Sequence, residues 1–507
     1  MEQKLKIYFT SDVHGYFFST NYASREEQNR GLLKCASQFE KDENTLIIDA
    51  GDILQGSAYT YYCQSELKSN ASIAAIMNQC GYDYVTLGNH DFNYGIDYQD
   101  SYIEALNGTC VCQNVKNADG STRYPYQIKT LGNGLKVGIV GIVTDYVNVW
   151  EKPANIAAVS IVDPFVEAKM ALEEMKDQVD VTICVYHGGF ERDLATGKLL
   201  SETKENVAYQ ICEELSFDLL LTGHQHMSIP GQLVNGTYVV QPKENATEYH
   251  KIEVVANDGG LEITSMIKRP DDASKCETSE ELLAIEADVQ DWLDNVVGEL
   301  EKPLLPEDKV TMAVNGNAIA DFINQIQLHY SKAQISAVSL ANEIAGFNKK
   351  VTRRDIITTY PYPNTLVVYE ISGKDLRAAI ERSAEYVDVD ENDKMVISKS
   401  FLEPKVEHYN YDYYAGVSYQ IDPSKEQGKR IISCTFEGKE INDADMFSIC
   451  INNYRASGAG DYPMYPKCKV INEINIEMVD MIMNYFEEMK NEVIQVMSSE
   501  KIMVLQS

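Results

Sequence analysis

Five apolar segments of the chain end in side chains that bind metal ions or transfer protons. Within a few residues of its last apolar position, each segment is followed by aspartate, asparagine or histidine. These residues are Asp12 and His14, Asp52, the run Asn89, His90 and Asp91, His187, and the pair His224 and His226. Each alone fits an ordinary turn or helix cap. Since five of the eight histidines occupy such positions, the pattern indicates one common site.

The residue types fit one kind of metal chemistry. Carboxylate, imidazole and amide oxygen together suit Mn²⁺, Fe or Zn²⁺, whereas an all-oxygen set would suggest Mg²⁺ or Ca²⁺. A pair of such cations about 3.5–4 Å apart needs one shared anionic ligand and separate outer ligands. The pair clamps the oxygens of an in-line displacement and generates hydroxide near neutral pH. Hydrolysis of a phosphate ester is the commonest use of such a centre.

The segments before these residues are predicted to be buried strands. Six short runs are nearly all apolar and rich in β-branched residues, as in strands covered on both faces. They lie within 4–10, 44–50, 82–88, 135–143, 179–186 and 217–223, and helical patterns occur at 69–81 and 166–178. This alternation predicts an α/β fold with the polar residues at the carboxyl ends of the strands, where such sheets place active sites. A hairpin over 251–269 closes this domain near residue 268.

The second half of the chain is predicted to form a separate domain. Residues 269–307 read as a linker with one long helix, because apolar residues recur at helical spacing and acidic residues fill the other face until Pro303 and Pro306. A partner-binding helix is the alternative. A domain from 308 to 507 follows, opening with a helix over 317–330. The expected domains are therefore 1–268, 269–307 and 308–507.

Composition limits the partners and the compartment. The net charge of −33 argues against a long nucleic acid as partner, while a small phosphorylated substrate is compatible if cations reverse the local sign. No apolar run approaches the roughly 20 residues needed to span a bilayer. Eleven scattered cysteines predict reduced, mostly buried thiols. The chain as given predicts a cytoplasmic protein, or a periplasmic or secreted one if a signal peptide was removed.

The ordered motifs Asp-x-His, Gly-Asp, Gly-Asn-His-Asp, His and Gly-His-x-His resemble those of the calcineurin-like metallophosphoesterases. The resemblance covers nearly all of the first 230 residues and implies a four-layer α/β/β/α domain. It implies that Asp12, His14 and His226 hold one metal. It further implies that Asn89, His187 and His224 hold the other, and that Asp52 bridges the two. The cations themselves, Mn²⁺, Zn²⁺, Fe or Co²⁺, are left open.

The same resemblance suggests roles for the two residues that follow Asn89. His90 is expected to steady the phosphoryl oxygen or to protonate the leaving group from outside the metal shell. Asp91 belongs to the same catalytic loop. It is expected to hold that loop rather than to perform chemistry.

The second half resembles the C-terminal α+β domain of the 5′-nucleotidase/UDP-sugar hydrolase superfamily, through "YPYPNTLVVYEISGKDLRAAIE" and "INNYRASGAGDYP". This resemblance implies that Tyr362 and Tyr454 sandwich a nucleobase, an interaction worth about 1–3 kcal/mol per base. Ordinary packing is the alternative role for each tyrosine. Asp461 matches a position that binds the nucleoside. The resemblance also implies rotation of this domain about the linker helix.

Details of the loops resemble one branch of the superfamily, the 2′,3′-cyclic-nucleotide 2′-phosphodiesterase/3′-nucleotidases. Typical 5′-nucleotidases carry aspartate where this chain has Asn93. They also carry a substrate-binding segment with an arginine that "SLANEIAGF" lacks. Asn342 is the candidate to keep the asparagine role of that segment. Arg455 is a candidate replacement cation or, alternatively, a surface residue.

The sequence therefore predicts a dinuclear metallohydrolase that favours 2′,3′-cyclic and 3′-nucleotides, with a metal-bound hydroxide attacking phosphorus. Two alternatives stay open. One is a 5′-nucleotidase or UDP-sugar hydrolase on the same scaffold, and the other is a nucleotide-binding protein that has lost catalysis. The oligomeric state and the physiological substrate are not predicted.

Overall fold

The computed structural model describes residues 2–200, 204–362, 364–403, 405–474, 476–490, 492–498 and 501–503, with residues 501–503 described by their backbone alone. The chain forms two compact units, 1–290 and 291–507. This division falls inside helix α8 (Glu280–Leu293), within the segment predicted as a linker. In the part of the chain that is described, no helix combines the length and apolar character that a membrane crossing requires.

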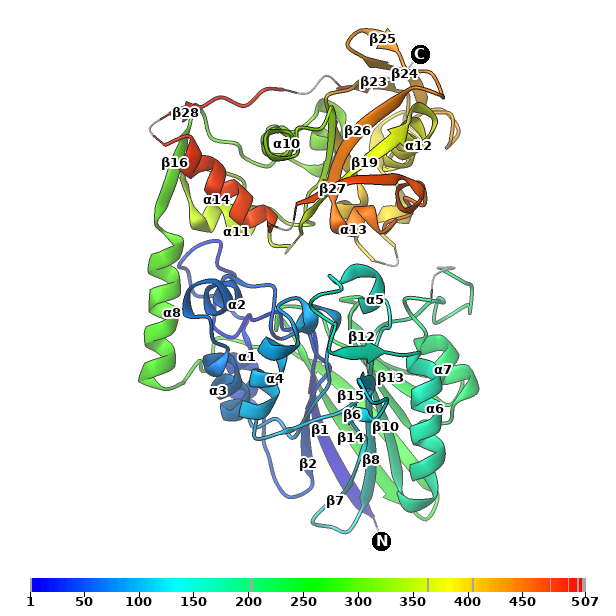
Figure 1. The fold of residues 1–507 in the computed structure, drawn as a ribbon. Coiled ribbons are helices and arrows are strands. Elements are labelled where there is room, and N and C mark those ends of the chain that lie inside the picture. Colours follow the sequence, from blue (N-terminus) through cyan, green and yellow to red (C-terminus); the bar gives the residue numbers. More distant parts are fainter. Residues whose placement is uncertain are drawn as a thin grey trace. The chain divides into compact units, whose positions relative to one another are not determined.

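Two six-stranded sheets form the centre of the N-terminal unit (Figure 1). The first has the order β15-β14-β1-β2-β3-β4 and the second the order β12-β13-β11-β10-β8-β7. Their bounds are β1 (Gln3–Thr10), β2 (Thr45–Asp49), β3 (Tyr84–Val85), β4 (Thr109–Cys110), β14 (Tyr249–Asn257) and β15 (Gly260–Lys268), then β7 (Gln127–Thr130), β8 (Lys136–Val143), β10 (Val181–His187), β11 (Leu219–Thr222), β12 (Ile229–Val234) and β13 (Thr237–Gln241). All six predicted strands and the predicted hairpin, β14–β15, are present.

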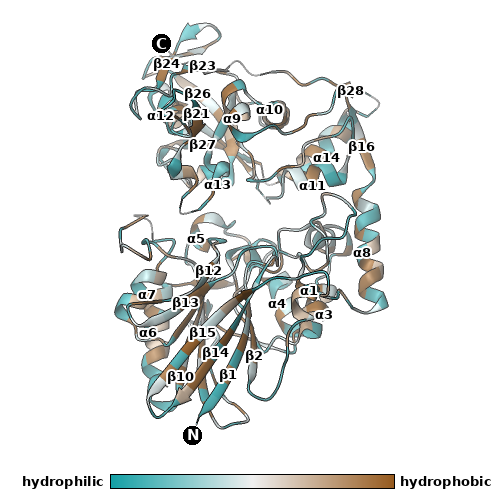
Figure 2. Cartoon of the chain, turned by 180° about the vertical axis from the view of Figure 1, so that it is seen from behind, coloured by the Kyte–Doolittle hydropathy of each residue, from teal (hydrophilic) through white to brown (hydrophobic). Residues whose placement is uncertain are grey.

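The inner faces of the two sheets share one hydrophobic core. Ile7 and Phe9 of β1 belong to the same buried cluster as Ile139 of β8 and Ile183 of β10. Figure 2 shows hydrophobic residues along β1, β2, β10 and β14. Because β1, β2 and β3 run parallel, as do β8, β10 and β11, the loops that leave their carboxyl ends gather at one edge of each sheet.

Helices cover the outer faces of both sheets (Figure 1). Helices α1 (Leu32–Ala36), α3 (Ala71–Cys80) and α4 (Ile96–Ala105) lie beside the first sheet, and α6 (Pro164–Met175) and α7 (Ala208–Glu214) beside the second. Ala168 and Ala171 of α6 and Ile211 of α7 pack on Val140 of β8 in a second core cluster. This arrangement confirms the predicted four-layer α/β/β/α domain. The eleven cysteines are unpaired, and nine are buried.

The C-terminal unit is built on a five-stranded mixed sheet with the order β22-β17-β26-β19-β27. The bounds are β22 (Asp412–Ala415), β17 (Ile335–Ser339), β26 (Met446–Asn452), β19 (Leu366–Ser372) and β27 (Lys469–Ile474). Helix α10 (Ala318–Ser331) packs on this sheet and begins where the side chain of Asn317 accepts hydrogen bonds from two backbone amides. The predicted helix over 317–330 and the α+β class are confirmed.

His250 of β14 is a buried titratable group away from the polar loops. The side chain is 0% exposed, and neither ring nitrogen has a hydrogen-bond partner among the described residues. Its ring lies 6.5 Å from that of Phe9. Burial lowers the pKa of His250, so the folded protein keeps this imidazole neutral at pH values where the unfolded chain protonates it.

We expect His250 to make the protein less stable in mild acid. Below a pH of about 6.5, the pKa of an ordinary histidine, His250 binds a proton in the unfolded chain but not in the folded protein. The free energy of unfolding therefore falls by up to about 1.4 kcal/mol for each unit by which the pH is lowered. Chemical denaturation of wild type and His250→Leu with a chelator present, between pH 8 and pH 5, checks this. Subtracting the unfolding free energy of His250→Leu from that of wild type at each pH cancels the contributions of the other titrating groups. A difference that does not change with pH would contradict the prediction.

Candidate metal centre

The predicted metal ligands lie in the loops that leave the carboxyl ends of parallel strands. Asp12 and His14 follow β1, Asp52 follows β2, and Asn89 begins a 3-10 helix (Asn89–Phe92) after β3. In the second sheet, His187 is the last residue of β10, and His224 and His226 follow β11. The structure brings these seven side chains together.

One group is formed by Asp12, His14 and His226. The Nε2 atoms of the two histidines are 3.3 Å apart, and His226 Nε2 is 3.3 Å from Asp12 Oδ1. Atoms bound at about 2.1 Å to one cation lie about 3.0–3.4 Å apart at octahedral or tetrahedral angles. These three side chains thus have the spacing of a shared coordination sphere.

A second group contains Asn89, His187 and His224. Asn89 Oδ1 is 3.1 Å from His187 Nε2 and 2.9 Å from His224 Nδ1. Asp52 lies between the two groups, because its Oδ2 is 3.2 Å from His187 Nε2 and 3.7 Å from His14 Nε2. Asp12 also approaches both groups, with Oδ1 4.0 Å from His187 Nε2.

Hydrogen bonds orient three of the imidazoles. The Nδ1 atom of His14 lies 3.0 Å from the carbonyl oxygen of Gln55, and that of His187 lies 2.8 Å from the carbonyl oxygen of Ala50. Since a carbonyl only accepts, each Nδ1 carries the proton and leaves Nε2 free for a cation. His224 is reversed. Its Nε2 lies 2.9 Å from Glu205 Oε1, so Nδ1 faces the site.

The electrostatics of the site suit bound cations. Asp12 and Asp52 are buried, and their ion-pair partners among the described residues are histidines. Burial opposes ionisation of both carboxyls, but His187 and the other nearby histidines hold the pKa of each below its ordinary value. Burial also disfavours charge on His187, yet Asp52 and Asp12 raise its pKa to about 10. The two carboxylates thus favour positive charge at this point, which bound divalent cations would supply.

His14 differs from His187 in its charge. Burial lowers the pKa of His14 to about 4, although Asp52 raises it. The imidazole is therefore neutral near pH 7, which is the form that ligates metals. The residues present fit a dinuclear cation site.

Backbone conformation at the site is strained. Five of the seven predicted ligands have positive φ angles: Asp12 (54°), His14 (50°), Asp52 (61°), His224 (68°) and His226 (55°). This left-handed region costs a residue with a side chain about 1–2 kcal/mol. Such strain clusters at functional sites, where the surrounding fold maintains it.

Two features of the Gly88–Asp91 turn set the position of Asp52. A Cβ on Gly88 would collide with the carboxylate of Asp52, so only glycine permits this approach. Asp91 is buried, and its carboxylate accepts hydrogen bonds from the backbone amides of Asp52, Ile53, Leu54 and Gly88 at 2.8–2.9 Å. Asp91 thus holds the loop, as expected, rather than facing the predicted ligands.

His90 lies beside the predicted ligands. Its backbone amide donates to Asp52 Oδ1 at 2.7 Å, and its ring is 5.4 Å from that of His14 in an edge-on orientation. Its Nδ1 is 2.8 Å from Asn93 Oδ1. The ring is therefore held at the border of the site, where the predicted contact with a phosphoryl group requires it.

The two tyrosines predicted to bind a base lie on adjoining segments of the C-terminal unit. β19 begins at Leu366 directly opposite Asn452, the last residue of β26. Asn453 and Thr365 extend this pairing, with the amide of Asn453 donating to the carbonyl of Thr365. Tyr362 and Tyr454, both half-buried, flank this pairing. Base binding by them stays a prediction.

The other predicted substrate residues have protein partners. Asn342 bonds to the backbone of Val406 and His408, and Asp461, with φ 66°, lies 3.3 Å from Arg382. The alternative that Arg455 is a surface residue is wrong, because it is 1% exposed. Its guanidinium bonds to Asp412, to Asn410 and to the carbonyls of Tyr409 and Ala459. We therefore do not include Arg455 in the proposed substrate site.

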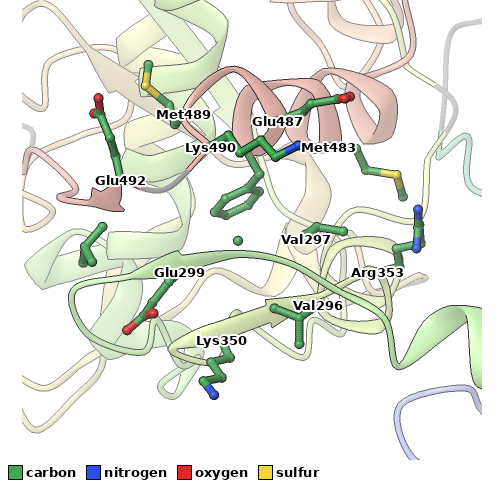
Figure 3. Close-up of a pocket in the computed structure, with 13 residues that line it drawn as sticks. Val296, Val297, Glu299, Lys350, Arg353, Met483, Glu487, Met489, Lys490 and Glu492 are labelled. Carbon is green, nitrogen blue, oxygen red and sulfur yellow. The ribbon is translucent and has the colours of Figure 1, made fainter.

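A cavity of about 630 Å³ lies elsewhere in the C-terminal unit (Figure 3). Val296, Phe486 and Val493 give it apolar walls, and Lys350 and Glu492 are among its charged residues. None of the residues predicted to bind metal or substrate lines it. The cavity therefore does not mark the metal centre.

Sequence reasoning missed two carboxylates and one aromatic residue at the site. Glu205 contacts His224, whose ring stacks on Trp150 at 5.5 Å, and Glu151 contacts Asn93. Trp150 ends helix α5 (Val147–Trp150), whereas Glu151 and Glu205 lie in loops, and none of the three has a motif spacing to the ligands. Only the folded chain brings them there.

Comparisons with known proteins agree with the fold. Residues 5–228 match the calcineurin-like phosphoesterase family, and residues 296–467 match the 5′-nucleotidase C-terminal domain. The chain belongs to the metallophosphoesterases that join these two domains, and it is an enzyme of this nucleotidase family.

Particular relatives cover most of the chain. A Staphylococcus aureus protein assigned as a 5′-nucleotidase, solved in complex with alpha-ketoglutarate, shares 32% identity at a TM-score of 0.91, with 99% of this chain and 100% of that one covered. The 2′,3′-cyclic-nucleotide 2′-phosphodiesterase/3′-nucleotidase of Salmonella typhimurium is 26% identical over 90% of this chain and 81% of its own length. The trifunctional nucleotide phosphoesterase YfkN of Bacillus subtilis is 26% identical over 96% of this chain, which spans 38% of that protein.

Backbone strain at His226 is open to a direct test. His226→Gly and His226→Ala both remove the imidazole, but only glycine adopts φ 55° without cost. In metal-free protein we expect the glycine variant to be more stable than the alanine variant by about 1 kcal/mol in chemical denaturation. The control is Ala287→Gly on the exposed face of α8, where glycine costs about 1 kcal/mol. Equal stability of the two His226 variants would show that the backbone there is unstrained.

Glu205 is expected to support a bound cation through His224. Glu205→Gln weakens the acceptor for His224 Nε2, so we expect about 10-fold lower affinity for one of two cations. Elemental analysis after dialysis against graded chelator concentrations measures this. The matched control is Glu214→Gln on α7, because Glu214 is exposed and bonds to Gln210. Unchanged metal retention in Glu205→Gln would contradict the prediction.

Proposed function

We propose that the protein is a dinuclear metal-dependent hydrolase of nucleotide phosphoesters that favours 2′,3′-cyclic nucleotides and 3′-nucleotides. The observation that carries the proposal is the pair of side-chain groups at the strand ends, with Asp52 between them. Membership of the nucleotidase family supports small nucleotides as the substrate class. Mn²⁺, Zn²⁺, Fe and Co²⁺ all accept the ligand set.

In the proposed reaction, seven side chains would bind the cations and His90 would act on the substrate. Asp52 would bridge two cations, with Asp12, His14 and His226 on one side and Asn89, His187 and His224 on the other. When bound, such cations activate water as a nucleophile and neutralise charge on the phosphoryl oxygens. His90 would hydrogen-bond a phosphoryl oxygen or protonate the departing ribose oxygen.

The preference among nucleotides rests on residues around the site. Asn93 faces His90. Typical 5′-nucleotidases of the superfamily that this chain resembles carry aspartate at the position of Asn93. The arginine of their substrate-binding segment has no counterpart in the segment around Asn342. Arg455 does not replace it, because its guanidinium is hydrogen-bonded to Asp412. The Salmonella typhimurium relative bears the name of the cyclic-nucleotide branch. We propose that Tyr362 and Tyr454 stack the base, with Asn342 and Asp461 nearby.

A 5′-nucleotidase is the second candidate, because the 32% identical Staphylococcus aureus protein is assigned as one. A UDP-sugar hydrolase belongs to the same alternative. A catalytically silent nucleotide-binding protein is disfavoured, since all seven predicted ligands are present and brought together.

One assay separates these possibilities. With Mn²⁺ added, we expect kcat/KM for 2′,3′-cyclic AMP and 3′-AMP to exceed that for 5′-AMP by about 10-fold or more. Asp52→Asn should lose activity and metal, while His90→Ala should keep both metals and lose about 10²–10⁴-fold in kcat, the range for one acid–base group. A preference for 5′-AMP would favour the second candidate. Wild-type rates in both variants would overturn catalysis at this centre.

A further inference from the structure

Asn93 lies between His90 and an acidic residue, Glu151. Its Oδ1 is 2.8 Å from His90 Nδ1, and its Nδ2 donates to Glu151 Oε2 at 2.7 Å. The two ends of an amide have nearly the same shape, so packing alone does not decide which end faces His90. A carboxylate only accepts hydrogen bonds. Glu151 therefore turns the NH₂ group toward itself and the oxygen toward His90.

Glu151 is itself fixed by other donors. Its Oε1 accepts from the side chain of Asn155 at 2.8 Å and from the backbone amide of Lys152 at 2.7 Å. The same Asn155 NH₂ group donates to the backbone carbonyl of Asn93 at 2.7 Å. Three donors thus converge on one carboxylate, and each of its oxygens is in use.

We propose that Glu151 is a positioning residue for the hydrolytic reaction, acting through Asn93 on His90. By presenting Oδ1 of Asn93, it keeps the proton of His90 on Nδ1 and the ring in one orientation. His90 Nε2 is then the atom available to the substrate. The side chain of Glu151 bonds to Asn93, Lys152 and Asn155 and, among the described residues, to none of the predicted metal ligands. The inference rests on the proposed role of His90, but not on which nucleotide is preferred.

The hydrogen-bond pattern predicts the effect of exchanging amide and carboxylate. In Glu151→Gln, the amide oxygen satisfies the two donors at the Oε1 position, so the new NH₂ group faces Asn93. Asn93 must then flip and present its own NH₂ to His90 Nδ1. In Asn93→Asp, two carboxylates face each other at hydrogen-bonding distance, and their repulsion moves the new carboxylate away from the position in which it would accept from His90 Nδ1. Each single variant therefore misorients His90 without changing side-chain volume appreciably.

The double variant Asn93→Asp/Glu151→Gln restores the pattern. The new aspartate accepts from both His90 Nδ1 and the NH₂ group of the new glutamine, and that glutamine still accepts from Lys152 and Asn155. A purely structural role for Glu151, tying the 151–155 segment to the His90 loop, predicts instead that the two defects add. The double variant therefore distinguishes a role of Glu151 in orienting His90 from a purely structural role.

The test measures kcat and KM with Mn²⁺ in wild type, both single variants and the double variant, for whichever of 2′,3′-cyclic AMP, 3′-AMP and 5′-AMP the wild type hydrolyses fastest, because a ribose oxygen needs a proton to leave. We expect each single variant to lose about 10- to 100-fold in kcat, part of what one acid–base group contributes, with KM within about two-fold and metal content unchanged. We expect the double variant to recover to within about three-fold of wild type. Losses that add in the double variant, or single variants as active as wild type, would overturn the inference.

His90→Ala is assayed in parallel to keep two failures apart. If His90→Ala retains the wild-type kcat, the proposed role of His90 fails. If His90→Ala is impaired but the single variants are not, the role of Glu151 alone fails.

Discussion

Asp12 and Asp52 are buried carboxylates, and their ion-pair partners among the described residues are histidines. Taking a carboxylate out of water costs several kcal/mol unless a counter-charge lies beside it. Much of the surrounding architecture follows from this constraint. Parallel strands of two sheets bring the loops to one place, glycine at position 88 leaves room for Asp52, and Asp91 ties the backbone around it. Divalent cations bound between these groups would provide the compensating charge.

The strained loops and the ordered hydrogen bonds serve the same end. Five left-handed residues hold their side chains toward a common point, and the hydrophobic core between the sheets maintains the strand ends that carry them. Carbonyl oxygens fix the protons of His14 and His187, and Glu205 fixes that of His224. The segment 150–155 contributes at two points, since Trp150 stacks on His224 and Glu151 reaches His90 through Asn93. Protein contacts thus orient these side chains at the strand ends.

In the C-terminal unit, a buried carboxylate is neutralised by an arginine instead of by histidines. Arg455 and Asp412 form a fully buried pair, and further acceptors from the 409–410 segment and Ala459 take the remaining donors of the guanidinium. This pairing fixes the loop after Tyr454 rather than presenting a cation to a ligand. The distinction matters for substrate preference, because it leaves no arginine among the proposed nucleotide contacts of this unit, which are Tyr362, Tyr454, Asn342 and Asp461.

The sequence alone predicted the strands and the polar residues at their ends, because apolar periodicity and strand-end polarity are local properties of the chain. The four-layer class and the assignment of ligands to two metals followed from the resemblance of the ordered motifs, not from periodicity. The motif order also indicated the family. Only the tertiary structure decided which carboxylates support the histidines. Glu151 and Glu205 lie far along the chain from His90 and His224, in loops whose composition resembles any solvent-exposed acidic segment. The burial of Arg455 was equally hidden, since a charged residue enters the interior only when a distant partner such as Asp412 meets it there.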